Sequence, residues 1–539
     1  MSDPTRSQQP EREGGGPVDA GDSAAASRPN IIVILADDMG FSDVGCFGGE
    51  IETPHLDALA TSGRRYTQMY NNCRCSPTRA SLLTGLYPTQ TGVGLLTQDQ
   101  GTPPYQGFLN RRCVTLGEAL RGAGYHTGIS GKWHVAGNRR MHCWPHRRGF
   151  DESLCGIGGN GYYTTERYLN GELIGISDDP DFHLTDATTQ HATATIRRFS
   201  QDDRPFFMYV AYNAPHFPLQ AFDTDIARYR GRYLEGWEEL RRTRYLAAIK
   251  QGVVAPDWAL PDPDEGAGEW EGEPDKVWQD ARMATYAAQV AHMDRGIGDI
   301  MSCLRDLRIV DNTLVLFMSD NGACSNELSI RTHQRVPTRN GGPMRAGNDP
   351  KVIPGPSDTW QSYGLSWANA SNSPFRRFKR WLEEGGIAGP CIMSWPGALS
   401  AGETDTESVL HVMDLMPTFM ELSGGEYPRE YGDRRIRPVE GESFAHLLRS
   451  PTEQKMQRRE LLYWEHLGHR AVRSDRWKIV DEEPTGNGWA LFDMVTDRTE
   501  THDLASAHPE IVADLADRWE EWKARVEVRT WDEKKGYRP

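Results

Sequence analysis

The stretch IIVILADD, residues 31–38, decides the fold of the chain. Its first six residues form a continuous apolar run rich in β-branched side chains, which is typical of a central strand buried on both faces of a parallel sheet. The run stops at two adjacent carboxylates, Asp37 and Asp38. Ligands of open α/β sheets bind at the carboxyl ends of the strands, and two buried carboxylates need a cation beside them. The pattern favours a cation site at this strand end, with a solvated turn as the alternative.

A second strand with the same kind of ending is expected near residue 313. Apolar residues from Met283 to Leu307 recur at spacings of three and four, which predicts a long helix that covers one face of the sheet. The apolar strand 313–318 follows this helix and leads into Asp320 and Asn321. The succession of strands and helices predicts an α/β fold in which a large, mostly parallel, mixed sheet is sandwiched by helices.

The two strand ends together offer only oxygen ligands. Three of the side chains are carboxylates and one is an amide, a set that suits Ca²⁺ or Mg²⁺ better than zinc. Mg²⁺ usually keeps several waters, so a set made mostly of protein oxygens favours Ca²⁺. The predicted metal ligands are Asp37, Asp38, Asp320 and Asn321.

Basic and histidine side chains follow further apolar segments. One predicted strand is followed by Lys132 and His134, the next by His216, and Lys379 lies in the later segment FKRWLEEGG. Cations and a divalent metal that converge on one anionic group would stabilise the transfer of a phosphoryl or sulfuryl group. A surface lysine and a histidine satisfied within a loop are about as consistent with the sequence alone.

The stretch NCRCSPTRASLLTG, residues 72–85, contains the candidate nucleophile. Ser76 is a good N-cap, Pro77 suits the first helical position, and Gly85 suits the residue after a helix end. A short helix is therefore predicted, with Cys75 just ahead of its amino end, where the helix dipole and Arg79 favour a thiolate or a bound anion. A buried structural cysteine is the alternative. Together with the oxygen ligands, the pattern predicts a hydrolase of an anionic ester whose nucleophile is Cys75 or a group made from it.

The chain is long enough for one large domain and a smaller one. Of its 539 residues, the first 28 are polar and predicted to form a disordered tail. Residues 29–430 are predicted to form the catalytic α/β domain. Residues 431–539 are predicted to form a C-terminal α+β subdomain, with short antiparallel strands between 461 and 492 and one helix over about 509–526.

Composition excludes several classes of function and predicts a compartment. The formal net charge of −16 argues against a general binder of nucleic acids or anionic membranes, and no apolar run is long enough to span a bilayer. The first 28 residues lack the apolar core of a secretory signal, and nine cysteines, an odd number, do not resemble a disulfide framework. These features predict a cytoplasmic protein.

Several segments resemble those of the sulfatase family. CSPTR followed by ASLLTG resembles the signature of the type I, formylglycine-dependent members, and only Cys75 has Pro and Arg at the required offsets. NIIVILADD, GKWH, NAPH, SDNG and FKRWLEEGGI resemble further sulfatase segments in the family's order, from about residue 29 to about 530. Segments before Lys379 look like the bacterial arylsulfatase branch. The resemblance implies the fold of the alkaline phosphatase superfamily.

The resemblance also implies a mechanism for the hydrolysis of aryl sulfates. Cys75 would be oxidised by a formylglycine-generating enzyme, and the hydrated aldehyde would attack sulfur and later expel sulfate. The metal, Ca²⁺ or Mg²⁺, would be held by the four predicted ligands together with residue 75. The implied roles are diol binding by Arg79 and Lys132, proton removal by His134, sulfate binding and leaving-group assistance by His216 and Lys379, and acceptance of the attacking proton by Asp320.

Two other functions remain open from the sequence. A phosphonate monoester or phosphodiester hydrolase resembles this family in fold, metal site and nucleophile. A sulfatase-like binding protein without activity is the second alternative, and the intact candidate residues argue against it. In each case the expected ligand is a small anionic ester rather than a nucleic acid or a membrane.

Overall fold

The strand predicted from IIVILADD is the middle of the molecule. In the computed structural model it is β1 (Asn30–Asp37), which pairs in parallel with β7 (Phe206–Pro215) and β8 (Thr313–Ser319). Every residue of β1 is buried, as the apolar run predicted. The structure describes residues 28–137, 140–156, 161–330, 338, 341–449, 461–482 and 488–529.

The main sheet is large, mixed and mostly parallel, which confirms the predicted fold class. Its strands run in the order β12-β2-β11-β8-β1-β7-β3-β4-β5-β6, with β13 beside β2. Strand β11 is antiparallel to both of its neighbours, and β5 is antiparallel to β4 and β6. The remaining strands of this sheet are β2 (Arg64–Tyr70), β3 (His126–Lys132), β4 (Glu152–Gly156), β5 (Arg167–Leu169), β6 (Glu172–Gly175), β11 (Ala388–Ser394), β12 (Glu403–Asp405) and β13 (Leu410–His411).

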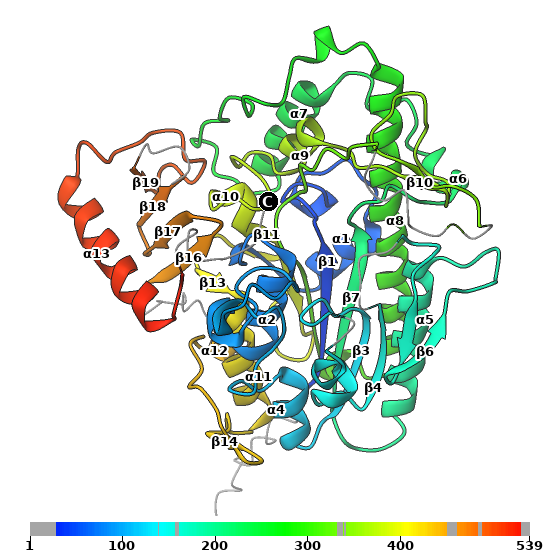
Figure 1. Ribbon diagram of the computed structural model, residues 1–539, viewed down its shortest axis with the longest axis vertical. Coiled ribbons are helices and arrows are strands. Elements are labelled where there is room, and N and C mark those ends of the chain that lie inside the picture. The colour runs from blue at the N-terminus through cyan, green and yellow to red at the C-terminus, as the bar shows by residue number, and fades with distance from the viewer. Residues whose placement is uncertain are drawn as a thin grey trace, which may run out of the picture.

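Helices cover both faces of the sheet, because successive side chains of β1 point to opposite sides. Ile32 and Ile34 belong to one apolar core with α1, α5 and α8, whereas Ile31 and Val33 belong to a second core with α2, α4 and α11. Figure 1 shows α5 and α8 along one side of the sheet and α2, α4 and α11 on the other. These helices are α1 (Pro54–Thr61), α2 (Cys75–Thr84), α4 (Leu116–Gly122), α5 (Leu184–Phe199), α8 (Lys276–Asp306) and α11 (Leu415–Ser423).

A second, antiparallel sheet lies beside the α/β body (Figure 1). It consists of β16 (Leu462–His466), β17 (His469–Arg473), β18 (Trp477–Asp481) and β19 (Trp489–Asp493), and α13 (Pro509–Arg525) packs on it. The predicted short strands and final helix are thus present. The predicted tail falls almost entirely on residues 1–27, which lie outside the described residues.

Shorter elements connect these layers. Among the described residues, no helix is both long and apolar enough to cross a bilayer. The described part of the segment 325–372 contains two short strands and a helix. The shorter elements are α3 (Pro88–Thr91), α6 (Asp223–Ile226), α7 (Trp237–Lys250), β9 (Arg345–Ala346), β10 (Thr359–Trp360), α9 (Leu365–Ser371), α10 (Glu384–Ile387), β14 (Glu430–Tyr431), β15 (Arg434–Arg435) and α12 (Ala445–Arg449).

A buried histidine caps α5 on the face covered by α8. The Nδ1 atom of His183 accepts the backbone N–H of Thr185 (3.3 Å), and its ring stacks on Tyr162 with centroids 5.1 Å apart. The neighbouring ring of His292 contacts Asp186 through Nε2 (2.6 Å). Burial and the nearby His292 lower the pKa of His183 to about 3. His183 is therefore neutral in the folded protein over most of the acidic range.

This neutral histidine should make the fold sensitive to acid. In the unfolded chain a histidine binds a proton below its ordinary pKa of about 6.5, whereas folded His183 resists protonation down to about pH 3, so stability is lost as the pH falls between these values. His183→Asn keeps a capping side chain but removes the titration. Between pH 6.5 and 4.5 we expect the variant to lose about 2 kcal/mol less unfolding free energy than the wild type. Urea unfolding at several pH values measures this, and equal pH slopes would contradict it.

Candidate functional site

Helix α2 places Cys75 at its first position rather than just ahead of it. The carbonyl of Arg74 accepts the N–H of Thr78 (2.9 Å), so the N-cap is Arg74, two residues earlier than the predicted cap at Ser76. Pro77 is then the third helical residue, where its missing N–H costs nothing because the first N–H groups of a helix have no partner within it. Gly85 ends the helix in the left-handed conformation, as predicted (φ +71°). Cys75 is buried, with 3% of its surface exposed.

The parallel pairing of β1 with β8 brings the predicted carboxylates together. Ala36 lies beside Ser319 in the register, so the residues that follow each strand are neighbours. The N–H of Asp38 donates to Asp320 Oδ1 (3.2 Å), and Asn321 Nδ2 donates to Asp38 Oδ1 (2.7 Å). All four predicted ligand side chains are buried, so their charges must be balanced within the protein.

Three cationic side chains from three different segments balance these carboxylates. Lys132 Nζ, at the end of β3, lies 2.5 Å from Asp37 Oδ2. Arg79 Nε and Nη2, from α2, lie 2.9 and 2.7 Å from Asp320 Oδ2. Lys379 Nζ lies 2.6 and 2.7 Å from the two oxygens of Asp38.

These pairings set the protonation of the carboxylates. Burial alone would raise the pKa of Asp37, but Lys132 and His216 hold it below its usual range. The pKa of Asp38 is lowered in the same way, against burial, by His216 and Lys379. Burial and the neighbouring Asp37 instead raise the pKa of Asp320 to about 7, although Arg79 opposes the rise. The cluster therefore holds two ionised carboxylates, Asp37 and Asp38, beside a third, Asp320, whose pKa is close to neutral pH.

Both predicted histidines reach the same cluster. His216 Nε2 lies 3.3 Å from Asp38 Oδ2, while its Nδ1 lies 2.5 Å from the carbonyl of Phe217 and so donates to it. Burial lowers the pKa of His216 to about 4. Burial and the nearby Lys132 keep the pKa of His134 well below its usual range. His134 Nδ1 is buried and has no hydrogen-bond partner among the described residues, which leaves it able to accept a proton.

Cys75 lies within the electrostatic reach of the same cations. Burial would lower the pKa of Arg79, but Asp320 and, to a smaller extent, Cys75 raise it. Asp38 and Cys75 likewise raise the pKa of Lys379 against the effect of burial. Every residue predicted for catalysis or metal binding is therefore part of one cluster in the described structure.

Two buried oxygens in this cluster fit a metal ion. Asp37 Oδ1 and Asn321 Oδ1 have no hydrogen-bond partner among the described residues, although both atoms are buried. Ligand atoms of Asp37, Asp38 and His216 lie within 4.8 Å of one another. Oxygens that lack a partner, next to ionised carboxylates, are what a hard cation requires. A divalent ion here would add positive charge to a cluster in which three carboxylates face three cations, and would favour an anionic ligand.

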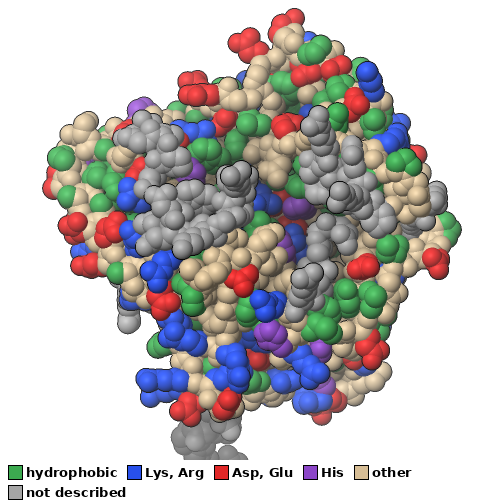
Figure 2. Space-filling model, in the orientation of Figure 1, with side chains coloured by type: hydrophobic (Ala, Val, Ile, Leu, Met, Phe, Trp, Pro, Cys, Tyr) green, Lys and Arg blue, Asp and Glu red, His purple; other side chains and the backbone are tan. Residues whose placement is uncertain are grey.

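The cluster lies beside a cavity and near a hollow in the surface. Figure 2 shows basic, acidic and histidine side chains at the bottom of a hollow over β1 in the middle of the face. A small cavity is lined by Asp38 and His216 and, on its other side, by Tyr286, Cys324 and Tyr363. The two tyrosine rings stack with centroids 4.4 Å apart. The cavity itself holds only about 10 Å³, so the arrangement can hold an anionic group at the cluster, bounded on this side by packed aromatic rings.

Three residues of this region were given no role from the sequence. Ser319 Oγ accepts the N–H of Met39 (3.1 Å) and donates to the carbonyl of Asn321 (2.8 Å), which ties the two strand ends together. The hydroxyl of Tyr162 contacts the carbonyl of His216 (2.8 Å), and Cys324 lines the cavity. The position of Ser319 directly before Asp320 was a usable signal, whereas Tyr162 lies too far along the chain to give one.

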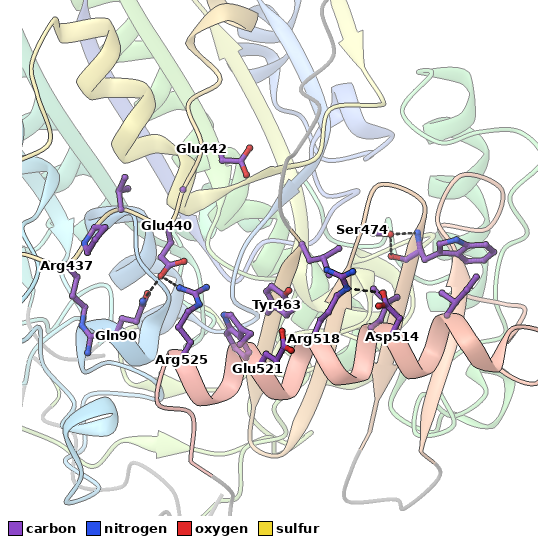
Figure 3. Close-up of a pocket in the computed structure, with 18 of the residues that line it drawn as sticks. Gln90, Arg437, Glu440, Glu442, Tyr463, Ser474, Asp514, Arg518, Glu521 and Arg525 are labelled. Atoms are coloured by element: carbon purple, nitrogen blue, oxygen red, sulfur yellow. Dashed lines mark hydrogen bonds and ion pairs between the residues drawn. The ribbon is translucent and has the colours of Figure 1, made fainter.

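A different hollow carries no comparable chemistry. A space of about 1360 Å³ is lined by residues of α13 and by those around Glu440. Figure 3 shows these lining residues. Glu440 is paired with Gln90 (2.6 Å) and Arg525 (2.5 Å), and Arg518 with Asp514 (2.9 Å). None of the predicted catalytic or metal-binding residues lines this space. The carboxylate cluster is therefore the candidate active site.

Comparison with known proteins agrees with this choice. A family model described as Sulfatase matches residues 29–425, and one described as N-sulphoglucosamine sulphohydrolase, C-terminal, matches residues 375–525. An uncharacterized sulfatase of Schizosaccharomyces pombe is 32% identical, covering 94% of this chain and 95% of that protein. An arylsulfatase of Klebsiella aerogenes is 33% identical, covering 81% of this chain and 96% of that protein. The crystal structure of Ps i-CgsB, 24% identical, has the same fold, with a TM-score of 0.67 over 95% of this chain and 100% of that one.

Binding of a metal at the cluster should stabilise the folded protein. We expect Ca²⁺ to raise the melting temperature, because the ion binds Asp37 and Asn321 oxygens that lack a partner in the folded state and are dispersed in the unfolded chain. At 100 times the dissociation constant the gain would be about 2.7 kcal/mol. Asp37→Asn and Asn321→Ala should each reduce the shift, and Mg²⁺ should give a smaller one. Thermal melts with Ca²⁺, Mg²⁺ and a chelator measure this, and an equal Ca²⁺ shift in all three proteins would contradict it.

Proposed function

Because the chain belongs to the sulfatase family, and is thus a hydrolase of sulfuric esters, we propose that it cleaves aryl sulfates with a formylglycine made from Cys75. The observation that carries this proposal is the position of Cys75 at the start of α2, within electrostatic reach of Arg79 and Lys379, which pair with the buried carboxylates. The sequence CSPTR at this position supports the conversion. Once converted and hydrated, residue 75 supplies the hydroxyl that attacks sulfur.

The metal of this site is proposed to be Ca²⁺, with Mg²⁺ as the other candidate. Asp37, Asp38, Asp320 and Asn321 would hold it together with the converted residue 75. When bound, the ion would supply positive charge that neutralises an oxygen of the sulfate group and so makes the sulfur easier to attack. The two buried oxygens without partners support this assignment, and the oxygen-only ligand set favours a hard cation.

The side chains of the cluster orient the nucleophile and move protons. Arg79 donates to Asp320 and, through Nη1, to the carbonyl of Lys132 (3.0 Å), so it fixes the end of β3 against the start of α2. Lys132 and Arg79 are the proposed binding groups for the diol of residue 75. His134 Nδ1, which has no partner in the described structure, is the proposed proton acceptor when sulfate is expelled. Asp320 is the proposed acceptor of the attacking proton.

Binding of the ester is assigned to the other side of the cluster. Lys379 and His216 both contact Asp38, and they are the residues proposed to bind the sulfate group and to assist the leaving oxygen. The cavity beside the stacked tyrosines 286 and 363 has a volume of only about 10 Å³, too small for a phenol, so the choice of an aryl sulfate rests on the sequence resemblance. The similarity to the Klebsiella aerogenes arylsulfatase supports the same choice of substrate.

We infer that the protein works in the cytoplasm and is matured there by a formylglycine-generating enzyme. All nine cysteines belong to the described residues and are unpaired, which supports a reducing compartment. The maturing enzyme would have to act before folding is complete, because Cys75 is buried within α2.

Removing the proposed nucleophile should abolish turnover without unfolding the protein. We expect Cys75→Ala to lose all detectable hydrolysis of an aryl sulfate, while its melting temperature stays within a few degrees of the wild type, since Ala suits a helix. The matched control is Cys73→Ala, two residues earlier, which removes a buried thiol that has no assigned role. Mass spectrometry of the wild-type peptide should show that residue 75 has lost its sulfur. Retained activity in Cys75→Ala would refute the assigned nucleophile.

The same site should prefer sulfate esters to phosphonate esters. A phosphonate monoester hydrolase was the open alternative from the sequence, and the named relatives favour a sulfatase instead. We expect the initial rate on an aryl sulfate to exceed that on an aryl phosphonate monoester with the same phenol, at equal concentrations. Wild-type protein and Cys75→Ala are assayed on both esters, the variant serving as the background. A dominant phosphonate rate that Cys75→Ala removes would show that this site prefers the other ester.

A further inference from the structure

The loop that delivers Lys379 to the cluster is attached to two parts of the active site. The N–H of Lys379 donates to the carbonyl of Ala323 (3.0 Å), shortly after Asp320 and Asn321. The N–H of Arg380 donates to the carbonyl of Cys73 (2.9 Å), shortly before Cys75. The backbone of this loop therefore bridges the metal-ligand turn and the nucleophile, and its conformation sets where the ammonium group of Lys379 lies.

This conformation is one that the loop would not favour by itself. Arg377 and Arg380, on either side of Lys379, both have left-handed backbones, with φ of +62° and +87°. Side chains other than glycine disfavour this region, and such residues persist only where their surroundings hold them. The position of Lys379 therefore depends on contacts that hold the flanking arginines.

The contacts of Arg377 come from outside the catalytic sheet. Its Nη2 lies 2.8 and 3.1 Å from the two oxygens of Glu482, and its Nε lies 3.2 Å from the first of them. Its Nη1 donates to Asp264 (2.7 Å), and the guanidinium lies 4.2 Å from the ring centre of Trp381. Glu482 directly follows β18, so the C-terminal sheet supplies the carboxylate that holds Arg377 through several hydrogen bonds.

A buried ionic cluster fixes the far end of the loop to the same sheet. Glu384, at the start of α10, contacts Lys478 of β18 (2.9 Å) and Arg498 (2.7 Å), and Lys478 also contacts Glu500 (2.8 Å). All four side chains are fully buried. Both ends of the segment that carries Lys379 are therefore held by residues of the C-terminal sheet and of the chain that follows it.

Close packing carries this constraint to the metal-ligand turn. A side chain at Gly322 would place its Cβ 1.7 Å from the carbonyl oxygen of Gly385, and one at Gly385 would collide with the carbonyls of Arg376 and Arg377 at 2.3 Å. The N–H of Gly385 also donates to the carbonyl of Arg376 (2.9 Å). The loop, α10 and the turn after Asn321 are packed backbone to backbone, so a shift of one is transmitted to the others.

We propose that Glu482 is a positioning residue for the reaction: through Arg377 it holds the loop that aims Lys379 at Asp38 and at the sulfate group. This inference rests on the proposed role of Lys379 in binding sulfate and assisting the leaving oxygen. Glu482 is a better test of it than the buried cluster around Glu384. The side chains of Glu482 and Arg377 are 19% and 21% exposed, and Arg377 keeps Asp264 when Glu482 is removed, so no isolated buried charge results.

The test is a double-mutant cycle between Glu482 and Lys379 in the full-length, matured chain. Glu482→Ala should lower kcat by about tenfold to 100-fold, as expected for a misplaced catalytic group. Glu482→Gln, which keeps one acceptor for Arg377, should restore part of the rate. In a Lys379→Ala background, Glu482→Ala should have little further effect, because the group that it positions is gone. The matched control is Glu520→Ala, which removes a carboxylate that pairs with Arg470 of the same sheet and should leave kcat unchanged.

The second measurement is the dependence of rate on the leaving group. For a series of aryl sulfates whose phenols differ in pKa, Lys379→Ala and Glu482→Ala should both make the rate depend more steeply on that pKa, and Glu520→Ala should not. All rates are divided by the fraction of chains whose residue 75 is converted. If the substitution only reduced the fraction of folded enzyme, it would lower the rates on all of these aryl sulfates by the same factor.

The outcomes separate the inference from the proposed function. If Lys379→Ala changes neither the rates nor their leaving-group dependence, the proposed role of Lys379 is wrong. The positioning role is wrong if Lys379→Ala has its expected effects but Glu482→Ala leaves kcat unchanged, as Glu520→Ala does. It is also wrong if the kcat losses of Glu482→Ala and Lys379→Ala simply multiply in the double variant. If Glu482→Ala is unfolded at the assay temperature, Glu482→Gln is used instead. This variant lacks the carboxylate charge, so wild-type kinetics with an unchanged leaving-group dependence would overturn the proposal.

Discussion

The structure depends on bringing three buried carboxylates to one place. Asp37, Asp38 and Asp320 lie at the ends of β1 and β8, shielded from water, where an unpaired charge is very costly. Lys132, Arg79 and Lys379 supply the compensating charges from β3, α2 and a distant loop. The central strands therefore cannot pack without the elements that carry these cations, and the same requirement that makes the fold possible gathers the groups that an anionic ester needs. A divalent ion added to this balanced set leaves a positive site.

Local patterns predicted the parts of the site that lie at strand ends. An apolar run followed by an acidic pair is visible within a few residues, and the parallel register then places Asp37 and Asp38 beside Asp320 and Asn321. The predicted start of α2 was wrong by two residues, because the bond from Thr78 N–H to the Arg74 carbonyl depends on how Asn72 and Cys73 turn, which residue preferences do not show. The contact between Arg377 and Glu482 joins residues 105 positions apart and has no periodic signal at all.

The spacing of residues in the sequence predicted the fold better than it predicted the function. Lys132 and His134 could have been a surface lysine and a loop histidine. Their burial at the same carboxylates that His216 and Lys379 contact argues against that interpretation. Convergence supports an anion-binding site beside Cys75, and the charges of sulfate and phosphonate esters are so similar that this geometry fits both. The CSPTR signature and the named relatives carry that choice. Physical reasoning thus located the site, and family membership identified its chemistry.

The buried ion pairs of the C-terminal sheet are better explained by geometry than by stability. Buried ion pairs contribute little to stability, because desolvation offsets much of their attraction. A gain in stability therefore does not explain the buried cluster of Glu384, Lys478, Arg498 and Glu500. Such clusters do tolerate only a narrow range of geometries, since a displaced partner leaves a bare charge. That property suits a segment with two left-handed arginines, whose flexibility would otherwise move Lys379. The sheet then acts on the reaction through geometry rather than through contact with the ester, and a chain without it would leave Arg377 and Glu384 without their strongest partners.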